Sequence, residues 1–160
     1  MPLTTGKRPW RRFGIAALIG MAGLTIASAT QAATCNTSTS ELVFGIYDTF
    51  STLPTDSATD IAVQCDAEAT YVVSLSAGFG SSGERRMQGS TGGALLYGLY
   101  TDPARLTAWG DGTEGTVTGS GSVASTPGAV TRHTVYGRIP ARQNVRVGSY
   151  RDGVTITVSY

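Results

Sequence analysis

The chain has 160 residues, 41% of them hydrophobic, and a formal net charge of +1. Four of its twelve basic residues lie within the first twelve positions, and without them eight arginines face eleven acidic residues, a net charge of −3. No basic patch remains after that removal, which excludes the electrostatic footprint expected of a protein that binds nucleic acid or an anionic membrane.

The first 32 residues have the pattern of a secretory signal peptide. Four basic side chains precede an uncharged run over residues 13–29 that is rich in Ala, Gly, Leu and Ile. The run is shorter than the roughly 20 apolar residues of a membrane span, and it ends in small residues with candidate cleavage sites after Ala29 and Ala32. An uncleaved N-terminal anchor is the alternative. We expect cleavage to leave residues 33–160, about the size of one domain, for export through the periplasm to the cell surface.

The exported part contains two cysteines, Cys35 and Cys65. An even number of cysteines in an oxidising compartment favours one disulfide between them, and the alternative is a pair of free buried thiols. Closing a loop of about 30 residues would stabilise the fold by roughly 3–4 kcal/mol on the chain-entropy model.

Short runs enriched in Val, Ile, Tyr and Thr follow one another along the exported part. They predict β-strands over residues 42–47, 61–65, 71–76, 95–100, 134–139 and 154–160. No helix of useful length is indicated, and Gly, Pro and Asp punctuate the gaps between the runs. This spacing predicts an all-β sandwich of short antiparallel strands. The glycine-rich residues 115–128 form either a long loop or a weak edge strand around Val117.

Alternation within two of these runs predicts which side chains face the core. Tyr71, Val73 and Leu75 share one side of their strand, and we expect that side to be buried. In the run over residues 134–139 the same pattern puts Gly137 on the core side, which predicts close packing or a bulge there.

The cleanest strand pattern lies at the end of the sequence. Val154, Ile156, Val158 and Tyr160 alternate with hydroxyl side chains, so one face is apolar and the other is polar. Nothing follows this strand to pair its far edge or to cover its apolar row. An unpaired edge beside an apolar groove is a template for strand addition, so we expect these four residues to form a groove that another polypeptide fills.

Three features of the sequence are candidate signs of a nucleotide-binding, catalytic or metal-binding site. Residues 78–83 match G-x-G-x-x-G, but the sequence after them lacks the apolar stripe of a helix, so we interpret them as a glycine-rich turn and expect no nucleotide cofactor. His133 is the only histidine, and no serine lies in a G-x-S-x-G elbow, so we expect no catalytic residues and no enzyme. One histidine and two cysteines expected to be oxidised predict no metal site.

The stretch from Trp109 to Thr113 allows two interpretations. It is either a loop that stacks on a sugar through Trp109 or a hairpin turn whose tryptophan packs on the sandwich, and we favour the turn. The alternative function that follows from the first interpretation is a self-contained extracellular β-sandwich that binds carbohydrate or another surface ligand through loops near Trp109 and Phe79.

Seven stretches together resemble the spore coat protein U domain family, which includes the subunits of archaic (Csu-type) chaperone-usher pili. They are residues 43–48, 61–65, 71–78, 96–102, 109–113, 135–141 and 148–152, and they cover nearly the whole exported part in order. The resemblance implies an immunoglobulin-like antiparallel sandwich that lacks its final strand. It also implies a disulfide from Cys35 to Cys65 that ties the first strand to the second, and a groove bordered by residues 154–160.

The partners implied by the resemblance are a periplasmic chaperone, an outer-membrane usher and neighbouring pilus or coat subunits, one of which completes the fold with its N-terminal extension. This chain departs from the pattern because cleavage after Ala32 leaves only Ala33 and Thr34 before Cys35, too few residues to donate a strand. The leading hypothesis is therefore a secreted structural subunit, without catalytic residues, that accepts a strand and occupies a tip or terminal position.

Overall fold

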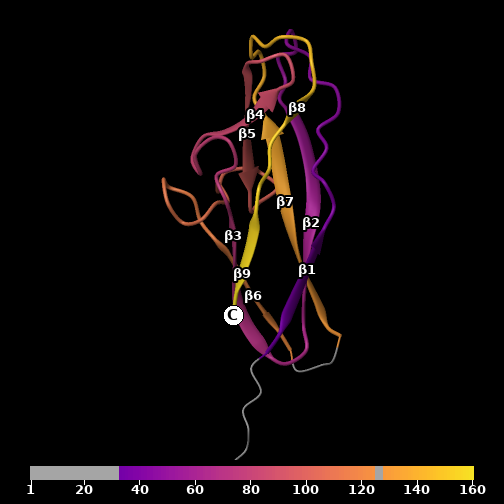
Figure 1. Ribbon diagram of the computed structural model, residues 1–160, viewed down its shortest axis with the longest axis vertical. Helices are drawn as coiled ribbons and strands as arrows, with labels where there is room; N and C mark the ends of the chain where they lie inside the picture. The colour runs from indigo at the N-terminus through magenta and orange to yellow at the C-terminus, as the bar shows by residue number, and fades with distance from the viewer. Residues whose placement is uncertain (1–32, 125–127) are drawn as a thin grey trace, which may run out of the picture. The chain divides into compact units, whose positions relative to one another are not determined.

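The computed structural model describes residues 33–124 and 128–160, and the predicted signal peptide over residues 1–32 lies outside them. The described part contains nine β-strands (Figure 1). They are β1 (Cys35–Thr39), β2 (Thr55–Cys65), β3 (Ala69–Leu75), β4 (Arg85–Gly89), β5 (Ala94–Tyr100), β6 (Gly119–Val123), β7 (Val130–Ile139), β8 (Tyr150–Arg151) and β9 (Ile156–Ser159). None of the described residues forms a helix long and apolar enough to span a membrane.

The strands form two sheets. The larger has the order β1-β2-β7-β5-β4-β8 and the smaller the order β6-β3-β9, and every pairing between these strands is antiparallel. The longest ladder joins β2 to β7, from the pair Thr55 and Ile139 to the pair Gln64 and Val130. Buried side chains from both sheets make one hydrophobic cluster. The all-β antiparallel sandwich expected from the sequence is confirmed.

The predicted core faces are also confirmed. Tyr71, Val73 and Leu75 of β3 are all buried, whereas Val72 between them is exposed. Gly137 of β7 is buried on the core side, and a Cβ atom there would lie 2.6 Å from both Leu42 Cδ2 and Phe44 Cζ. The glycine is required because these two side chains pack directly on the backbone of β7.

The disulfide between Cys35 and Cys65 is present, as predicted. The two residues are directly opposite each other in the ladder between β1 and β2, and Cys65 is buried. The crosslink therefore ties the first strand to the second at one end of the larger sheet.

One expected strand is absent from the structure and another is shorter than expected, whereas β2 and β7 begin earlier than expected, at Thr55 and Val130. Residues 42–47 form no strand, because their backbone pairs with no neighbouring strand and Gly45 takes a left-handed φ of 77° that interrupts the extended chain. The last strand is shorter than expected and spans Ile156–Ser159, because the residues before it cross from one sheet to the other. Within residues 115–128, where a loop or a weak edge strand was expected, β6 occupies Gly119–Val123.

Candidate functional site

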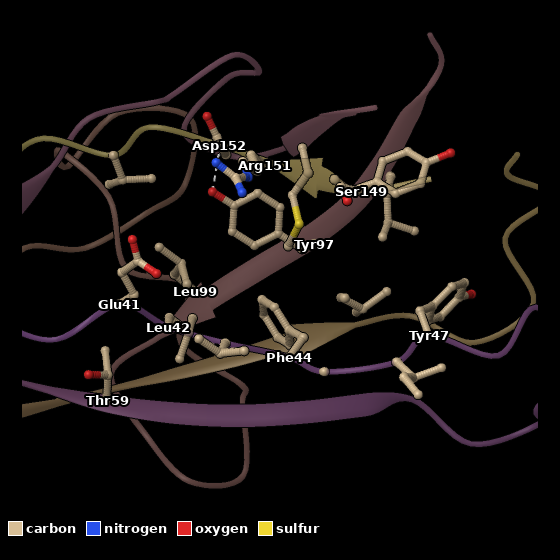
Figure 2. A pocket seen from close by; sticks show the side chains of 18 of the residues that line it. Glu41, Leu42, Phe44, Tyr47, Thr59, Tyr97, Leu99, Ser149, Arg151 and Asp152 are labelled. Carbon is tan, nitrogen blue, oxygen red and sulfur yellow. Dashed lines mark hydrogen bonds between the residues drawn. The ribbon is translucent and has the colours of Figure 1, made fainter. Parts of the chain in front are cut away.

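A groove of about 1140 Å³ is the main concavity of the described residues. Two chain segments border it, and we call residues 39–50 the N-terminal wall and residues 145–156 the C-terminal wall. Buried side chains from both sheets make its floor (Figure 2). They are Ile61, Leu75, Met87, Leu95, Tyr97, Leu99, Val135 and Ile139.

From residue 40 to residue 47 the N-terminal wall is an extended segment whose backbone pairs with no strand. Leu42 and Phe44 turn toward the core, while Val43 between them is exposed. The wall is attached to β2 through side chains, because the Ser57 hydroxyl donates to the carbonyl of Val43 at 2.7 Å and the Thr59 hydroxyl to that of Ser40 at 3.1 Å. Within the described part of the chain, the backbone N–H groups of residues 41–47 make no hydrogen bond.

The C-terminal wall changes sheets along its length. Its β8 pairs with β4 in the larger sheet, with Tyr150 opposite Gly89. Residues 152–155 then cross to the smaller sheet, where β9 pairs with β3. Val154 and Ile156 are half-buried, and both line the groove.

The outer edge of β9 carries unpaired backbone groups. Ser76 N–H donates to the carbonyl of Thr155 at 2.9 Å, so the backbone of Thr155 faces β3. In an antiparallel ladder this orientation alternates, and Ile156 and Val158 therefore direct their N–H and C=O groups away from β3. Leu75, opposite Ile156, shows the same alternation, since its N–H donates to Gly110 on the other side of β3. The groove thus lies beside an unpaired strand edge.

The four residues expected to border a partner strand do not share one location. Val154 and Ile156 line the groove, and Val158 packs half-buried against the core farther along β9. Tyr160 is 58% exposed and borders a shallow depression on the smaller sheet beside Val72. The opposite wall with Leu42 and Phe44 was not foreseen, because Leu42, Val43 and Phe44 are consecutive apolar residues whose pattern does not distinguish a groove wall from an ordinary strand.

One polar group on the floor connects to a wall. The Tyr97 hydroxyl donates to Oδ2 of Asp152 at 2.6 Å, as Figure 2 shows. Burial raises the pKa of Tyr97, and the hydrogen bond to the Asp152 carboxylate raises it further. The hydroxyl therefore stays protonated and remains a donor over the ordinary pH range.

The other residues considered from the sequence lie away from the groove. Trp109 is only 2% exposed, and its indole N–H donates to the carbonyl of Val73, so it packs in the core as the turn interpretation expected and offers no face to a sugar. The residue 78–83 motif leads into β4, not into a helix. His133 is half-buried and shares a hydrogen bond of 2.8 Å with the Tyr71 hydroxyl. Burial lowers the pKa of His133.

Comparisons with known proteins show which family and which relative this chain is similar to. The model of the Spore Coat Protein U domain matches residues 21–157. A protein named Protein U from Myxococcus xanthus is 34% identical over 132 residues, which cover 74% of this chain and 71% of that protein.

A solved structure shows the same fold. It is the crystal structure of the CsuC-CsuE chaperone-tip adhesion subunit pre-assembly complex from archaic chaperone-usher Csu pili of Acinetobacter baumannii, with a TM-score of 0.58 and 23% sequence identity. The match covers 81% of this chain and spans 40% of the chain in that structure.

Proposed function

The chain belongs to the spore coat protein U domain family, and on that premise we propose that it is a structural subunit of a surface pilus or coat, completed by a β-strand from another polypeptide. The observation that carries this proposal is the pair of unpaired backbone edges on either side of an apolar groove. The N-terminal wall offers free N–H groups, and β9 directs the backbone groups of Ile156 and Val158 outward. A strand laid between them would pair on both sides.

Energetics favour such an occupant. A strand with alternating apolar residues would place about four side chains on the floor, and burial of each contributes roughly 1.5–3 kcal/mol. The sum is comparable with the net stability of a whole domain, typically about 5–15 kcal/mol. The incoming strand would therefore be a component of the fold as well as a link between subunits.

The partners proposed for this groove follow the order of assembly. A periplasmic chaperone would fill it first, an outer-membrane usher would receive the complex, and a neighbouring subunit would then supply the permanent strand. The related Csu structure is a pre-assembly complex of a chaperone with a subunit, which supports the first step. Export would use residues 1–32 as a signal peptide and leave residues 33–160 as the assembled domain. We assign no catalytic residue.

We further propose that the subunit accepts a strand without donating one. Cleavage after Ala32 would leave two residues before Cys35, and cleavage after Ala29 would leave five that are small or polar. Neither remnant has the alternating apolar pattern that a groove requires, which supports the proposal of a tip or terminal position. Mass spectrometry of the exported protein would contradict this if the N-terminus lay well upstream of Ala27.

The groove is tested by adding a synthetic peptide of alternating Val and Thr, with an Arg at each end, to the purified protein. At a concentration of about 100 times its dissociation constant the peptide should stabilise the fold by about 2.7 kcal/mol, which corresponds to a rise in melting temperature of roughly 10 °C. Ile156→Asp should abolish this gain because it places a charge on the apolar lining of the groove.

Thr157→Asp provides the matched control, because the neighbouring side chain on β9 is exposed and points away from the groove. This variant should keep the full gain in melting temperature. A protein that is stable alone and indifferent to the peptide would contradict the proposal and favour a self-contained sandwich.

A further inference from the structure

We propose that Tyr97 and Asp152 form a positioning pair that sets the separation of the two groove walls and thereby controls how fast a strand is captured. This inference rests on the proposed function. Tyr97 belongs to β5 on the groove floor, and Asp152 belongs to the C-terminal wall between β8 and β9. Neither residue belongs to the unpaired edge of β9, so the role that we assign to them is to hold the two walls in position.

Tyr97 contacts both walls at once. Its ring packs edge-to-face against Phe44 of the N-terminal wall, with the ring centroids 6.1 Å apart. Its hydroxyl, at the far end of the same ring, donates to Asp152 of the C-terminal wall. Figure 2 shows Phe44 on one side of Tyr97 and Asp152 at its hydroxyl. A rigid aromatic ring thus spans the floor and connects the walls.

Asp152 is fixed by more than the tyrosine. Its Oδ1 atom accepts hydrogen bonds from the backbone N–H of Phe79 at 2.9 Å and from that of Gly153 at 2.7 Å. Gly78 leaves the space that the carboxylate occupies, because a Cβ atom there would overlap it. The carboxylate therefore joins β5, the turn after β3 and the C-terminal wall.

This location matters because the wall changes sheets here. Between β8 and β9, the hydrogen bonds that attach it to the sheets come from Asp152 and from Thr155, whose N–H and C=O groups bond to Ser76. Loss of the Asp152 contacts would leave β9 held on β3 by its ladder and by Thr155, while the wall before Thr155 becomes free to move. The edge would survive, but the groove beside it would lose its defined width.

The first test is Tyr97→Phe, which removes the hydroxyl and keeps the ring on Phe44. At a temperature where every variant is fully folded by circular dichroism, the association rate of the Val/Thr peptide should fall about tenfold. Hydrogen exchange without peptide should quicken at residues 152–155 and stay unchanged at residues 61–65. The control is Tyr100→Phe on the same strand, whose hydroxyl makes no hydrogen bond among the described residues and whose removal should change neither reading.

Three further variants address Asp152, the partner of the tyrosine. Asp152→Asn keeps an oxygen that can accept the hydrogen bonds of the turn. Its association rate with the peptide should therefore lie between that of the native protein and that of Asp152→Ala. Gly78→Ala should displace the carboxylate without altering Tyr97 and slow association in the same way. Gly78→Ala thus tests the pair even if Tyr97→Phe folds poorly.

The outcomes separate the two proposals. An unchanged association rate and unchanged exchange in Tyr97→Phe and Gly78→Ala would overturn the positioning role while leaving the groove intact. A native protein that fails to bind the peptide would overturn the proposed function. In that case faster exchange at residues 152–155 in Tyr97→Phe would still support the pair as the anchor of the wall, and unchanged exchange would overturn it.

Discussion

Around the disulfide, β1 pairs with β2 along its whole length, from Cys35 to Thr39, and we call this part of the larger sheet the closed region. Beyond Thr39 the chain leaves the ladder with β2 and continues as the N-terminal wall, where the backbone of residues 40–47 pairs with no strand. The side chains beneath the two regions are nearly equally buried. Val63 in the closed region is 0% exposed, and Tyr97 on the groove floor is 8% exposed.

The difference between the closed region and the groove therefore lies in the backbone. Wall side chains such as Leu42, Phe44 and Ile156 cover the floor well enough to limit its exposure, but they do so without a ladder between them. Backbone groups that find no partner in the fold are available to another chain. The side chains of the groove floor are therefore nearly as well buried as those of the closed region, and only the backbone hydrogen bonds are missing.

The largest effect that would sharpen this comparison is expected at Trp109, which is buried in the core outside the groove lining. Trp109→Ala should lower the free energy of unfolding by about 3–5 kcal/mol, because it leaves a large cavity in the core and removes the hydrogen bond from the indole to Val73. The matched change is Phe50→Ala on the N-terminal wall, where the aromatic side chain is 90% exposed. This variant should change the free energy of unfolding by no more than about 0.5 kcal/mol. Urea denaturation measures both. Similar losses in the two variants would contradict the division between a closed and an open region.

The next effect is that of the disulfide. Replacing Cys35 and Cys65 by alanine should lower the free energy of unfolding by about 3–4 kcal/mol, because a crosslink between residues 30 positions apart is lost. Because the bond lies outside the groove lining, the folded double variant should still bind the Val/Thr peptide with native affinity. Reduced native protein should show the same melting temperature as the variant. Loss of peptide binding in the folded variant would show that the closed region and the groove are coupled.

Much of the fold could be predicted from the sequence. Period-2 alternation over residues 71–75 identified the buried face of β3, and the presence of only two cysteines identified the crosslink. The strands β1 and β4 were missed because Cys35–Thr39 is polar and lies on an exposed edge, and because the core face of β4 is occupied by a buried arginine, Arg85. Such strands exist through tertiary pairing and have little pattern of their own.

The candidate site could be predicted only in part. Alternation at the C-terminus indicated Val154 and Ile156, which line the groove. The opposite wall was expected to be an ordinary strand, because a sequence pattern reports apolar spacing but not whether a backbone partner exists. The pair of Tyr97 and Asp152 could not be foreseen, because it joins residues 55 positions apart across the fold.

The smallest effect concerns His133, whose ring packs edge-on between Tyr71 and Trp109. Burial lowers the pKa of His133 below its ordinary value of 6.5, so folding favours the neutral ring. Its contribution to stability is therefore fully present above pH 6.5 and is lost as the pH falls through the lower pKa of the folded state. Urea midpoints of the native protein should decrease modestly between pH 7.5 and pH 5.

His133→Gln should make the urea midpoint nearly independent of pH over that range, because this is the only histidine in the sequence. The peptide affinity of the folded native protein should not change between pH 7.5 and pH 5, since His133 does not line the groove. If affinity fell together with stability, protonation within the core would be altering the walls. The closed region would then control the open one, and the two could not be treated as independent.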